Sequence, residues 1–315
     1  MVAAVRTVLG DIAPGELGVC DAHDHLFLRS PVLPGQELDD PEPAAARLRA
    51  FHALGGRAVV QWTPHGMGRE AGALAALSRA TGTHVVAATG LHQAAHYPPE
   101  LLDRIRDDLA ALFVAEVTEG IGDTGVRAGL IKVAGAFHTL DAHARLTMTA
   151  AAGAHHRTGA PIAVHLELGT AALDVLELLC GELGVPPHRV VLGHLGRSPD
   201  GAVQREAARA GAFLAFDGPS RANHATDWRL PEELAELAGA GFTGQLMLGG
   251  DTTVPETPGM PYLLRRLRPR LEEVLGAEAM ETVLVANPAR AFAFEAPVES
   301  GSARGGPSPD GPPGA

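Results

Sequence analysis

The sequence predicts an α/β fold, a single (β/α)₈ TIM barrel, and three observations support it. The chain has 315 residues, of which 46% are hydrophobic and 20% charged, so a large core is available and global disorder is excluded. This length suits one barrel of about 250 residues with additions at its ends. Short β-rich runs alternate eight times with longer runs rich in alanine and leucine, which is typical of a parallel sheet closed within a ring of helices. An open, doubly wound sheet is the alternative, but the glycine-rich phosphate-binding turn of that fold is not visible after the first strand.

The expected elements follow one another regularly along the chain. Residues 1–17 precede the barrel, and residues 6–9 and 11–17 predict a short N-terminal hairpin that caps it. Residues 1–295 are expected to form one domain, and the Gly-, Pro- and Ser-rich segment 296–315 is predicted to be a disordered tail. Strands are predicted over residues 18–21, 58–61, 84–89, 129–133, 161–165, 190–194, 212–217 and 245–251. Helices are predicted over residues 43–54, 71–80, 99–116, 142–158, 171–183, 200–210, 231–238 and 261–275.

The charge balance and the small number of cysteines narrow the classes of function. There are 25 Lys and Arg against 37 Asp and Glu, a net charge of −12, and an acidic chain is a poor binder of nucleic acid or of an anionic membrane. No apolar run reaches the roughly 18 residues that cross a bilayer. Cys20 and Cys180 are the only cysteines, and the N-terminus lacks a signal-peptide pattern, so we expect a cytoplasmic protein. Its expected partner is a small-molecule substrate, and a homodimer is left open.

Residues that can bind metal ions stand at the ends of several predicted strands. In this fold the carboxyl ends of the strands form the active face, so these side chains are expected to meet. His23 and His25 are two residues apart and face the same way on an extended segment. Taken singly, each histidine is weak evidence, because a lone histidine at a strand end is more often a buried residue that bonds a backbone carbonyl. Together they predict a divalent-metal site built from His23, His25, His165, His194 and Asp251.

Lys132, predicted near the end of the fourth strand, is the only lysine of the chain. An ammonium group beside metal ions is repelled, and burial among positive charges favours the neutral amine. A neutral amine can add carbon dioxide to give a carbamate, whose two oxygens could bridge two metal ions. Arginine cannot react in this way, because it is not deprotonated in proteins. A Schiff-base lysine of an aldolase is the alternative, and the surrounding histidines argue against it.

Several segments resemble those of one known family. From about Arg6 to Phe294 the chain resembles the phosphotriesterase family of the amidohydrolase superfamily. The family's N-terminal signature is similar to residues 7–10, 16–18 and 23–27, and its segment with a carbamylated lysine is similar to residues 128–133. The other similar segments are residues 164–170, 192–195, 216–218 and 287–290.

The resemblance implies a hydrolase with a binuclear centre, usually of zinc, that uses a metal-bridging hydroxide. Carbamylated Lys132 would bridge the two metals, and Asp251 would accept the hydroxide proton, so these two are the predicted catalytic residues. The expected substrates are small esters, lactones or amides, with phosphotriesters left open. A single-metal deaminase and a non-catalytic binding barrel are the alternatives. The implied metal ligands are His23, His25 and Asp251 for the buried metal, and His165 and His194 for the exposed one.

Two departures from the family's pattern bear on the substrate. Gly196 stands where many members have an acid two residues after the strand-six histidine, which leaves a proton relay through that position open. The connection over residues 252–259 is short, which argues against a long acyl chain. Arg221 is the candidate for holding an anionic group of the substrate, and Trp62 is expected to pack under the barrel rim. The residues predicted to contact substrate are His65, His92, Tyr97, Arg221 and His224.

Overall fold

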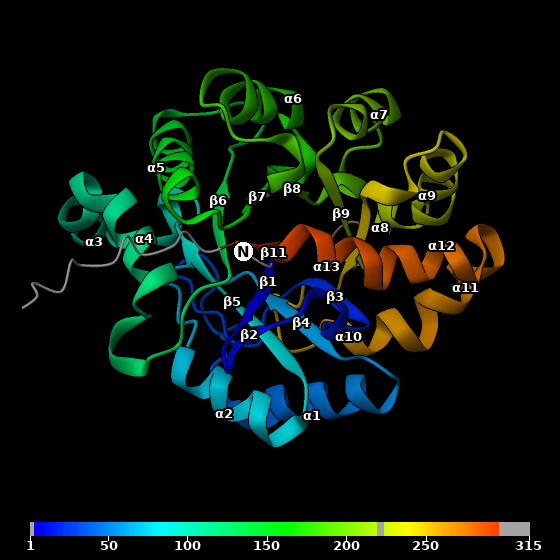
Figure 1. Ribbon diagram of the computed structural model, residues 1–315, viewed down its shortest axis with the longest axis horizontal. Helices are drawn as coiled ribbons and strands as arrows, with labels where there is room; N and C mark the ends of the chain where they lie inside the picture. The colour runs from blue at the N-terminus through cyan, green and yellow to red at the C-terminus, as the bar shows by residue number, and fades with distance from the viewer. Residues whose placement is uncertain (1–2, 219–223, 296–315) are drawn as a thin grey trace, which may run out of the picture.

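Eight parallel strands form the central sheet, in the order β10-β9-β8-β7-β6-β5-β4-β3. The computed structural model describes residues 3–218 and 224–295, so the tail predicted over residues 296–315 lies outside the described residues. Helices surround the strands (Figure 1), which confirms the (β/α)₈ barrel. The strands are β3 (Cys20–Asp24), β4 (Ala58–Gln61), β5 (His84–Gly90), β6 (Leu130–Ala134), β7 (Ile162–His165), β8 (Val190–Gly193), β9 (Phe213–Asp217) and β10 (Leu246–Gly249).

Most helices begin and end close to their predicted limits, and π-helical stretches continue α6 over Glu177–Glu182 and join α10 to α11 over Leu263–Leu267. At the start of α5, the Asp141 carboxylate accepts a hydrogen bond from the backbone N–H of Ala144, and Gly159, with a φ of 75°, follows the last residue of that helix. The single helix predicted over residues 99–116 is instead two, because a 3₁₀ turn at Arg106–Asp108 separates α3 from α4. The helices are α1 (Pro41–Ala53), α2 (Ala71–Thr81), α3 (Pro99–Ile105), α4 (Leu109–Thr118), α5 (Ala142–Thr158), α6 (Ala172–Leu176), α7 (Gly201–Ala210), α8 (His224–Asp227), α9 (Leu230–Gly239), α10 (Gly259–Tyr262), α11 (Arg268–Leu275), α12 (Ala277–Glu281) and α13 (Asn287–Phe292).

The predicted N-terminal hairpin is present and closes one end of the barrel. Strands β1 (Ala4–Thr7) and β2 (Gly10–Ile12) pair antiparallel. A third strand that the sequence did not predict, β11 (Ala293–Phe294), pairs with β1 from the other side. Figure 1 shows all three strands in front of the barrel, at the amino ends of its strands. This end is sealed, so the opposite end is left for a site.

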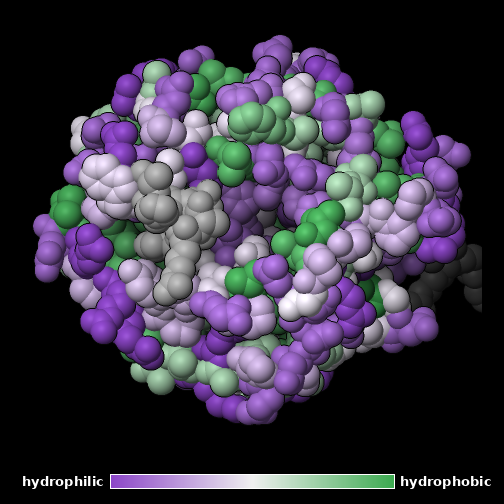
Figure 2. Space-filling view, turned by 180° about the vertical axis from the view of Figure 1, so that it is seen from behind, coloured by the Kyte–Doolittle hydropathy of each residue, from purple (hydrophilic) through white to green (hydrophobic). Residues whose placement is uncertain are grey.

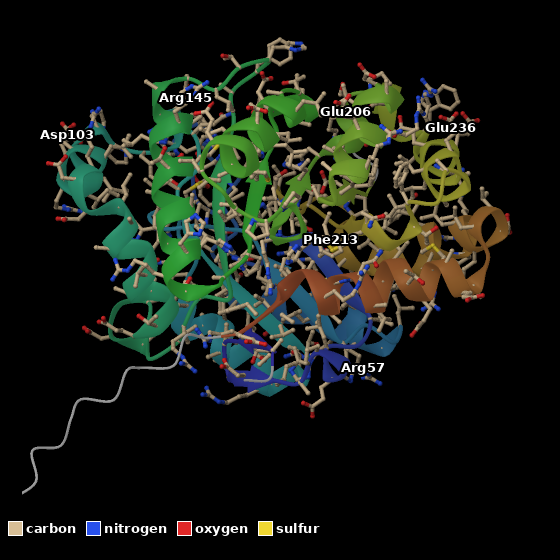
Figure 3. The ribbon with its side chains drawn as sticks, turned by 45° about the horizontal axis from the view of Figure 1, so that its top comes forward. Arg57, Asp103, Arg145, Glu206, Phe213 and Glu236 are labelled. Atoms are coloured by element: carbon tan, nitrogen blue, oxygen red, sulfur yellow. The ribbon has the colours of Figure 1, made fainter. Side chains whose placement is uncertain are left out.

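Two groups of buried apolar side chains form the core. One group packs between the strands and the helices. The other consists largely of small residues at alternate positions of the barrel strands, such as Ala22, Ala163 and Ala215, and alternate positions of a strand share one face. Charged residues such as Asp103 and Glu206 lie exposed on the outer helices, whereas Phe213 is buried (Figure 3). Within the described ranges, no helix is both long and apolar enough to span a membrane.

Candidate metal centre

The six residues predicted to hold metal ions line one cavity of about 340 Å³. They come from the carboxyl ends of different strands, which meet at the same end of the barrel. Figure 2 shows this face of the molecule, which is hollowed at its centre, with hydrophilic residues in the hollow. The six residues are His23, His25, Lys132, His165, His194 and Asp251.

His23, His25 and Asp251 form the deeper part of the cavity. The Asp251 Oδ1 atom lies 3.7 Å from Nε2 of His23 and 3.8 Å from Nε2 of His25. The Nδ1 atoms point the other way: Nδ1 of His23 is 2.9 Å from Asp217 Oδ1, and Nδ1 of His25 is 2.7 Å from Thr63 Oγ1. The Thr63 hydroxyl donates its own hydrogen to the Phe27 carbonyl, so it accepts from His25. Both rings therefore carry their hydrogen on Nδ1 and direct the Nε2 lone pair toward Asp251.

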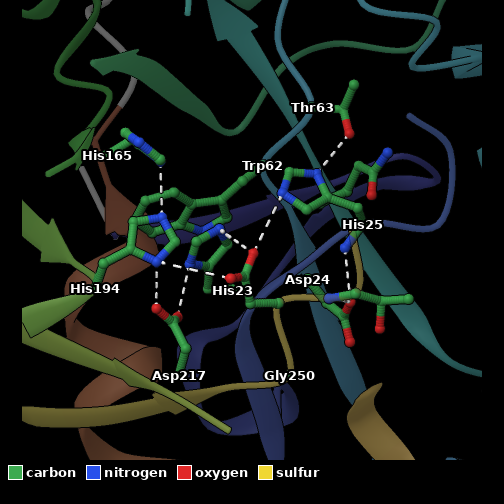
Figure 4. A network of polar contacts seen from close by, with 12 residues as sticks. His23, Asp24, His25, Trp62, Thr63, His165, His194, Asp217 and Gly250 are labelled. Atoms are coloured by element: carbon green, nitrogen blue, oxygen red, sulfur yellow. Dashed lines mark hydrogen bonds and ion pairs between the residues drawn. The ribbon is translucent and has the colours of Figure 1, made fainter. Parts of the chain in front are cut away.

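His165 and His194 form the outer part of the cavity. Nδ1 of His165 lies 2.8 Å from Nε2 of His194, so these two ring nitrogens converge (Figure 4). Their other nitrogens face carboxylates: Nε2 of His165 lies 3.0 Å from Glu167 Oε2, and Nδ1 of His194 contacts Asp217. Burial, together with His194 and Lys132, holds the pKa of His165 well below its usual value. A neutral imidazole is the form that binds metal ions.

Asp217, at the end of β9, connects the two parts of the cavity. Its Oδ1 faces Nδ1 of His23 and its Oδ2 faces Nδ1 of His194, so one carboxylate orients two rings. Burial alone would lower the pKa of His194, but Asp217 and Asp251 raise it. No role was predicted for Asp217 from the sequence, although an acid at the end of a barrel strand is a signal for one.

Lys132 lies in β6 with 2% of its surface exposed and lines the cavity beside these groups. Burial lowers the pKa of its amine to about 7, against the opposing effects of Asp251 and Glu167. The backbone of Gly90 packs directly on Lys132: a Cβ at Gly90 would lie 1.9 Å from the Lys132 carbonyl oxygen, and the φ of Gly90 is +103°. Only glycine has no Cβ and also adopts this φ readily. The close contact between Gly90 and the strand that carries Lys132 therefore requires glycine at this position.

The residues predicted to contact substrate lie in different environments. His92 lines the cavity, and its buried Nδ1 has no hydrogen-bond partner among the described residues. Tyr97 does not line this cavity: it is buried, its hydroxyl accepts a bond of 2.6 Å from the His92 N–H, and it borders a separate cavity of about 400 Å³. His65 also lies outside the lining and contacts Glu116 at 2.9 Å. Arg221 and the side chain of His224 lie outside the described residues.

Gln93 and Arg197 are two groups near the candidate ligands that were not predicted from the sequence, whereas Trp62 was. Gln93 lines the cavity and donates a hydrogen bond of 2.9 Å to Glu167. Arg197, next to Gly196, comes within 3.9 Å of Asp251 Oδ2 and pairs with Asp227. Trp62 is fully buried beneath the cavity, where its indole stacks on the His23 ring with centroids 3.8 Å apart. Its position under the metal ligands agrees with the expected packing below the rim.

Comparison with known proteins identifies the family. The chain matches the phosphotriesterase family over residues 3–292. A phospho-furanose lactonase of Mycoplasmopsis agalactiae is 30% identical, and the match covers 93% of this chain and 92% of that protein. Among solved structures, a lactonase from Listeria monocytogenes has a TM-score of 0.86 at 29% identity, covering 93% of this chain and 99% of the other. A phosphotriesterase homology protein from Escherichia coli, solved with phosphate in its active site, has a TM-score of 0.83 at 28% identity, covering 88% and 99%. This chain is a member of the phosphotriesterase family.

Proposed function

We propose that this protein is a binuclear zinc enzyme that hydrolyses lactones and other small esters. As a member of the phosphotriesterase family with lactonases among its relatives, it is a metal-dependent hydrolase. The observation that carries this proposal is the orientation of four of the histidines that line the cavity, His23, His25, His165 and His194. One ring nitrogen of each histidine bonds a carboxylate or a hydroxyl, and the other ring nitrogen points into the cavity. Partners of this kind fix the tautomer of metal-binding histidines.

The donor set fits zinc, which takes imidazole nitrogen and carboxylate oxygen as ligands. Carbamylated Lys132 would be shared by the two ions. When bound, the zinc ions would bring the pKa of a coordinated water toward 7 and polarise the carbonyl that is attacked. The remaining ligands would be His23, His25 and Asp251 for one ion, and His165 and His194 for the other.

Lys132 and Asp251 carry out the chemical steps that belong to the protein's own side chains. The neutral amine of Lys132 attacks carbon dioxide; the new N–C bond gives a carbamate, and the proton leaves to solvent. The Asp251 carboxylate accepts the proton of the attacking water and returns it to the departing alkoxide of the opened ester. Asp251 is placed for this because it lines the cavity within 3.8 Å of Nε2 of both His23 and His25, with Arg197 within 3.9 Å.

The shape and lining of the cavity support a small, polar substrate. A volume of about 340 Å³ is at the small end of ligand pockets. His92, Gln93 and His96 on one wall offer groups that bond hydroxyls. A sugar-derived lactone satisfies both conditions, and the relative from M. agalactiae is named for such a compound. We place a hydroxylated five-membered lactone first among candidate substrates.

The test is metal content followed by a substrate panel. Elemental analysis of the purified protein is expected to find about two zinc ions per chain, and chelation should abolish hydrolysis. The panel compares hydroxylated lactones with and without a phosphate group, simple alkyl lactones, aryl esters and N-acyl amides. One metal with deamination, or ligand binding without turnover, would instead support the two alternatives drawn from the sequence.

A further inference from the structure

The proposed metal centre lies across the seam of the barrel. Strand β3 is the first strand of the sheet and β10 the last, and among the described residues no strand ladder joins them. His23 and His25 come from one side of this seam and Asp251 from the other. One backbone hydrogen bond crosses it at this point, from the N–H of Asp251 to the carbonyl of His23, at 2.9 Å. Something further must hold these ligands at a fixed spacing.

Two buried aspartates bond backbone on both sides of the seam. Asp21 Oδ1 accepts the N–H of His23 at 3.1 Å and the N–H of Gly250 at 3.0 Å. Asp24 Oδ1 accepts the N–H of His25 at 2.7 Å and the N–H of Thr252 at 2.8 Å. The four amides belong to the two histidine ligands themselves and to the residues on either side of Asp251.

The outer oxygens of the two aspartates turn toward each other. Both side chains are fully buried, and neither Oδ2 atom has a hydrogen-bond partner within the described part of the chain. A Cβ added at Gly250 would lie 2.4 Å from Oδ2 of Asp24 and 2.8 Å from Oδ2 of Asp21, so both oxygens converge beside Gly250 (Figure 4 shows Asp24 and Gly250 beside the histidines). Two buried carboxylates so placed cannot both be charged without a large penalty.

The inner oxygens of the two aspartates already accept the four backbone N–H groups. A proton shared between the two outer oxygens would therefore give every buried oxygen of the pair a partner.

We propose that Asp21 and Asp24 are positioning residues, a buried pair of aspartates that holds His23, His25 and Asp251 at the spacing the metal requires across the barrel seam. This inference rests on the proposed metal centre, and it adds the device that assembles that centre from two ends of the sheet. Neither aspartate reaches the cavity lining, so both act through the backbone of the ligands.

Asparagine substitutions test whether the two aspartates act as a pair or independently of each other. In Asp21→Asn or Asp24→Asn, the amide oxygen still accepts the backbone N–H groups, and the amide NH₂ donates to the remaining carboxylate. In the double variant, two NH₂ groups face each other and no acceptor is left. Asp24→Ala removes the bonds to His25 and Thr252 altogether and serves if the double variant does not fold. Asp200→Ala is the matched control, because Asp200 also accepts two backbone N–H groups, at 3.0 and 3.1 Å, at the start of α7.

The measurements are zinc affinity, by competition with a chromophoric chelator, and the melting temperature of the metal-free protein. Each single asparagine variant is expected to bind zinc with an affinity within about twofold of that of the wild type. This is the usual deviation from additivity for substitutions at independent sites. The double variant and Asp24→Ala should lose about 10- to 100-fold, the usual cost of removing a partner of a metal ligand. Asp200→Ala should melt at a lower temperature with unchanged zinc affinity.

Two results overturn the inference. If the double variant loses only the product of the two single losses, to within about twofold, the aspartates do not act as a pair. If Asp24→Ala melts lower but binds zinc like the wild type, its role is structural only. In either case the wild type still binds two ions and the proposed function stands. A wild-type protein that binds no zinc would overturn both.

Discussion

Replacing Lys132 by arginine tests the proposed centre directly, because it keeps a long cationic side chain and removes the reactive amine. Burial lowers the pKa of Lys132 from 10.5 to about 7, which corresponds to about 5 kcal/mol in favour of the neutral form. At pH 8 about 90% of such an amine is neutral, against about 0.3% at the ordinary pKa, so the fold raises the reactive fraction about 300-fold. Arginine has no neutral form to gain.

The assay follows recovery of lactonase activity when metal-free protein receives zinc at a fixed concentration of dissolved carbon dioxide. The initial rate of recovery should rise with pH through about 7, being about tenfold slower at pH 6 than at pH 8, because the neutral fraction changes by that factor. Lys132→Arg should recover neither activity nor two bound metals at any pH. Lys132→Ala should be inactive alone but partly rescued by a short carboxylic acid that takes the place of the carbamate.

Three outcomes would refute this reasoning. An active Lys132→Arg enzyme with two zinc ions would exclude a bridging carbamate. A recovery rate that stays flat from pH 6 to 9 would show that the amine is not the group that reacts. A rate that is still rising steeply above pH 9 would show that the fold does not lower the pKa of Lys132.

Four further tests, three by substitution and one with a substrate series, address other parts of the structure. Asp217→Ala should weaken zinc binding about 10- to 100-fold, because it releases the rings of both His23 and His194. Thr63→Val releases only the His25 ring and should weaken zinc binding less. Equal losses of affinity in a chelator competition would contradict the bridging role of Asp217. Asp251→Asn should keep most of the metal but lower kcat about 100-fold or more, and an unchanged kcat would remove Asp251 as the proton acceptor. Burial alone would raise the pKa of Glu116, but hydrogen bonds from His65, Arg69 and Thr89 lower it to about 2. The contribution of Glu116 to stability is therefore present above about pH 4.5 and is lost as the pH falls toward 2. Glu116→Ala, which leaves Arg69 buried and unpaired, should cost about 3–5 kcal/mol in urea unfolding at pH 7, with a smaller difference from the wild type at pH 3; a loss that does not depend on pH would assign it to packing. Finally, kcat/KM should stay flat or fall as an alkyl lactone lengthens, because the cavity of about 340 Å³ adjoins a short connection after β10, and a steep rise with each methylene would contradict a small polar site.

The order of the elements and the convergence of the candidate metal ligands on one cavity could be predicted from the sequence because both depend on local position. Each strand is a short run that can be recognised alone, and the ends of parallel strands meet at one edge. His165 ends β7, His194 follows β8, and Lys132 lies in β6, so their convergence follows once the barrel is assumed. Even Asp251, which lies two residues beyond the observed end of β10, remained close enough to the edge for its place to be predicted.

The tertiary structure alone decided what each ligand's other atoms touch. Asp217 meets His23 from 194 residues away and Thr63 meets His25 from 38, and no local pattern in the chain indicates such pairs. The structure also turned His65 and Tyr97 away from the cavity, because loop side chains follow the contacts available in the folded protein: Glu116 for His65, and the backbone of His92 for Tyr97. The bonds that Asp21 and Asp24 make across the seam, to the N–H groups of Gly250 and Thr252, depend on how the last strand returns to the first. The position of a strand end depends on the neighbouring sequence. The partners that orient the side chains there depend on closure of the whole barrel.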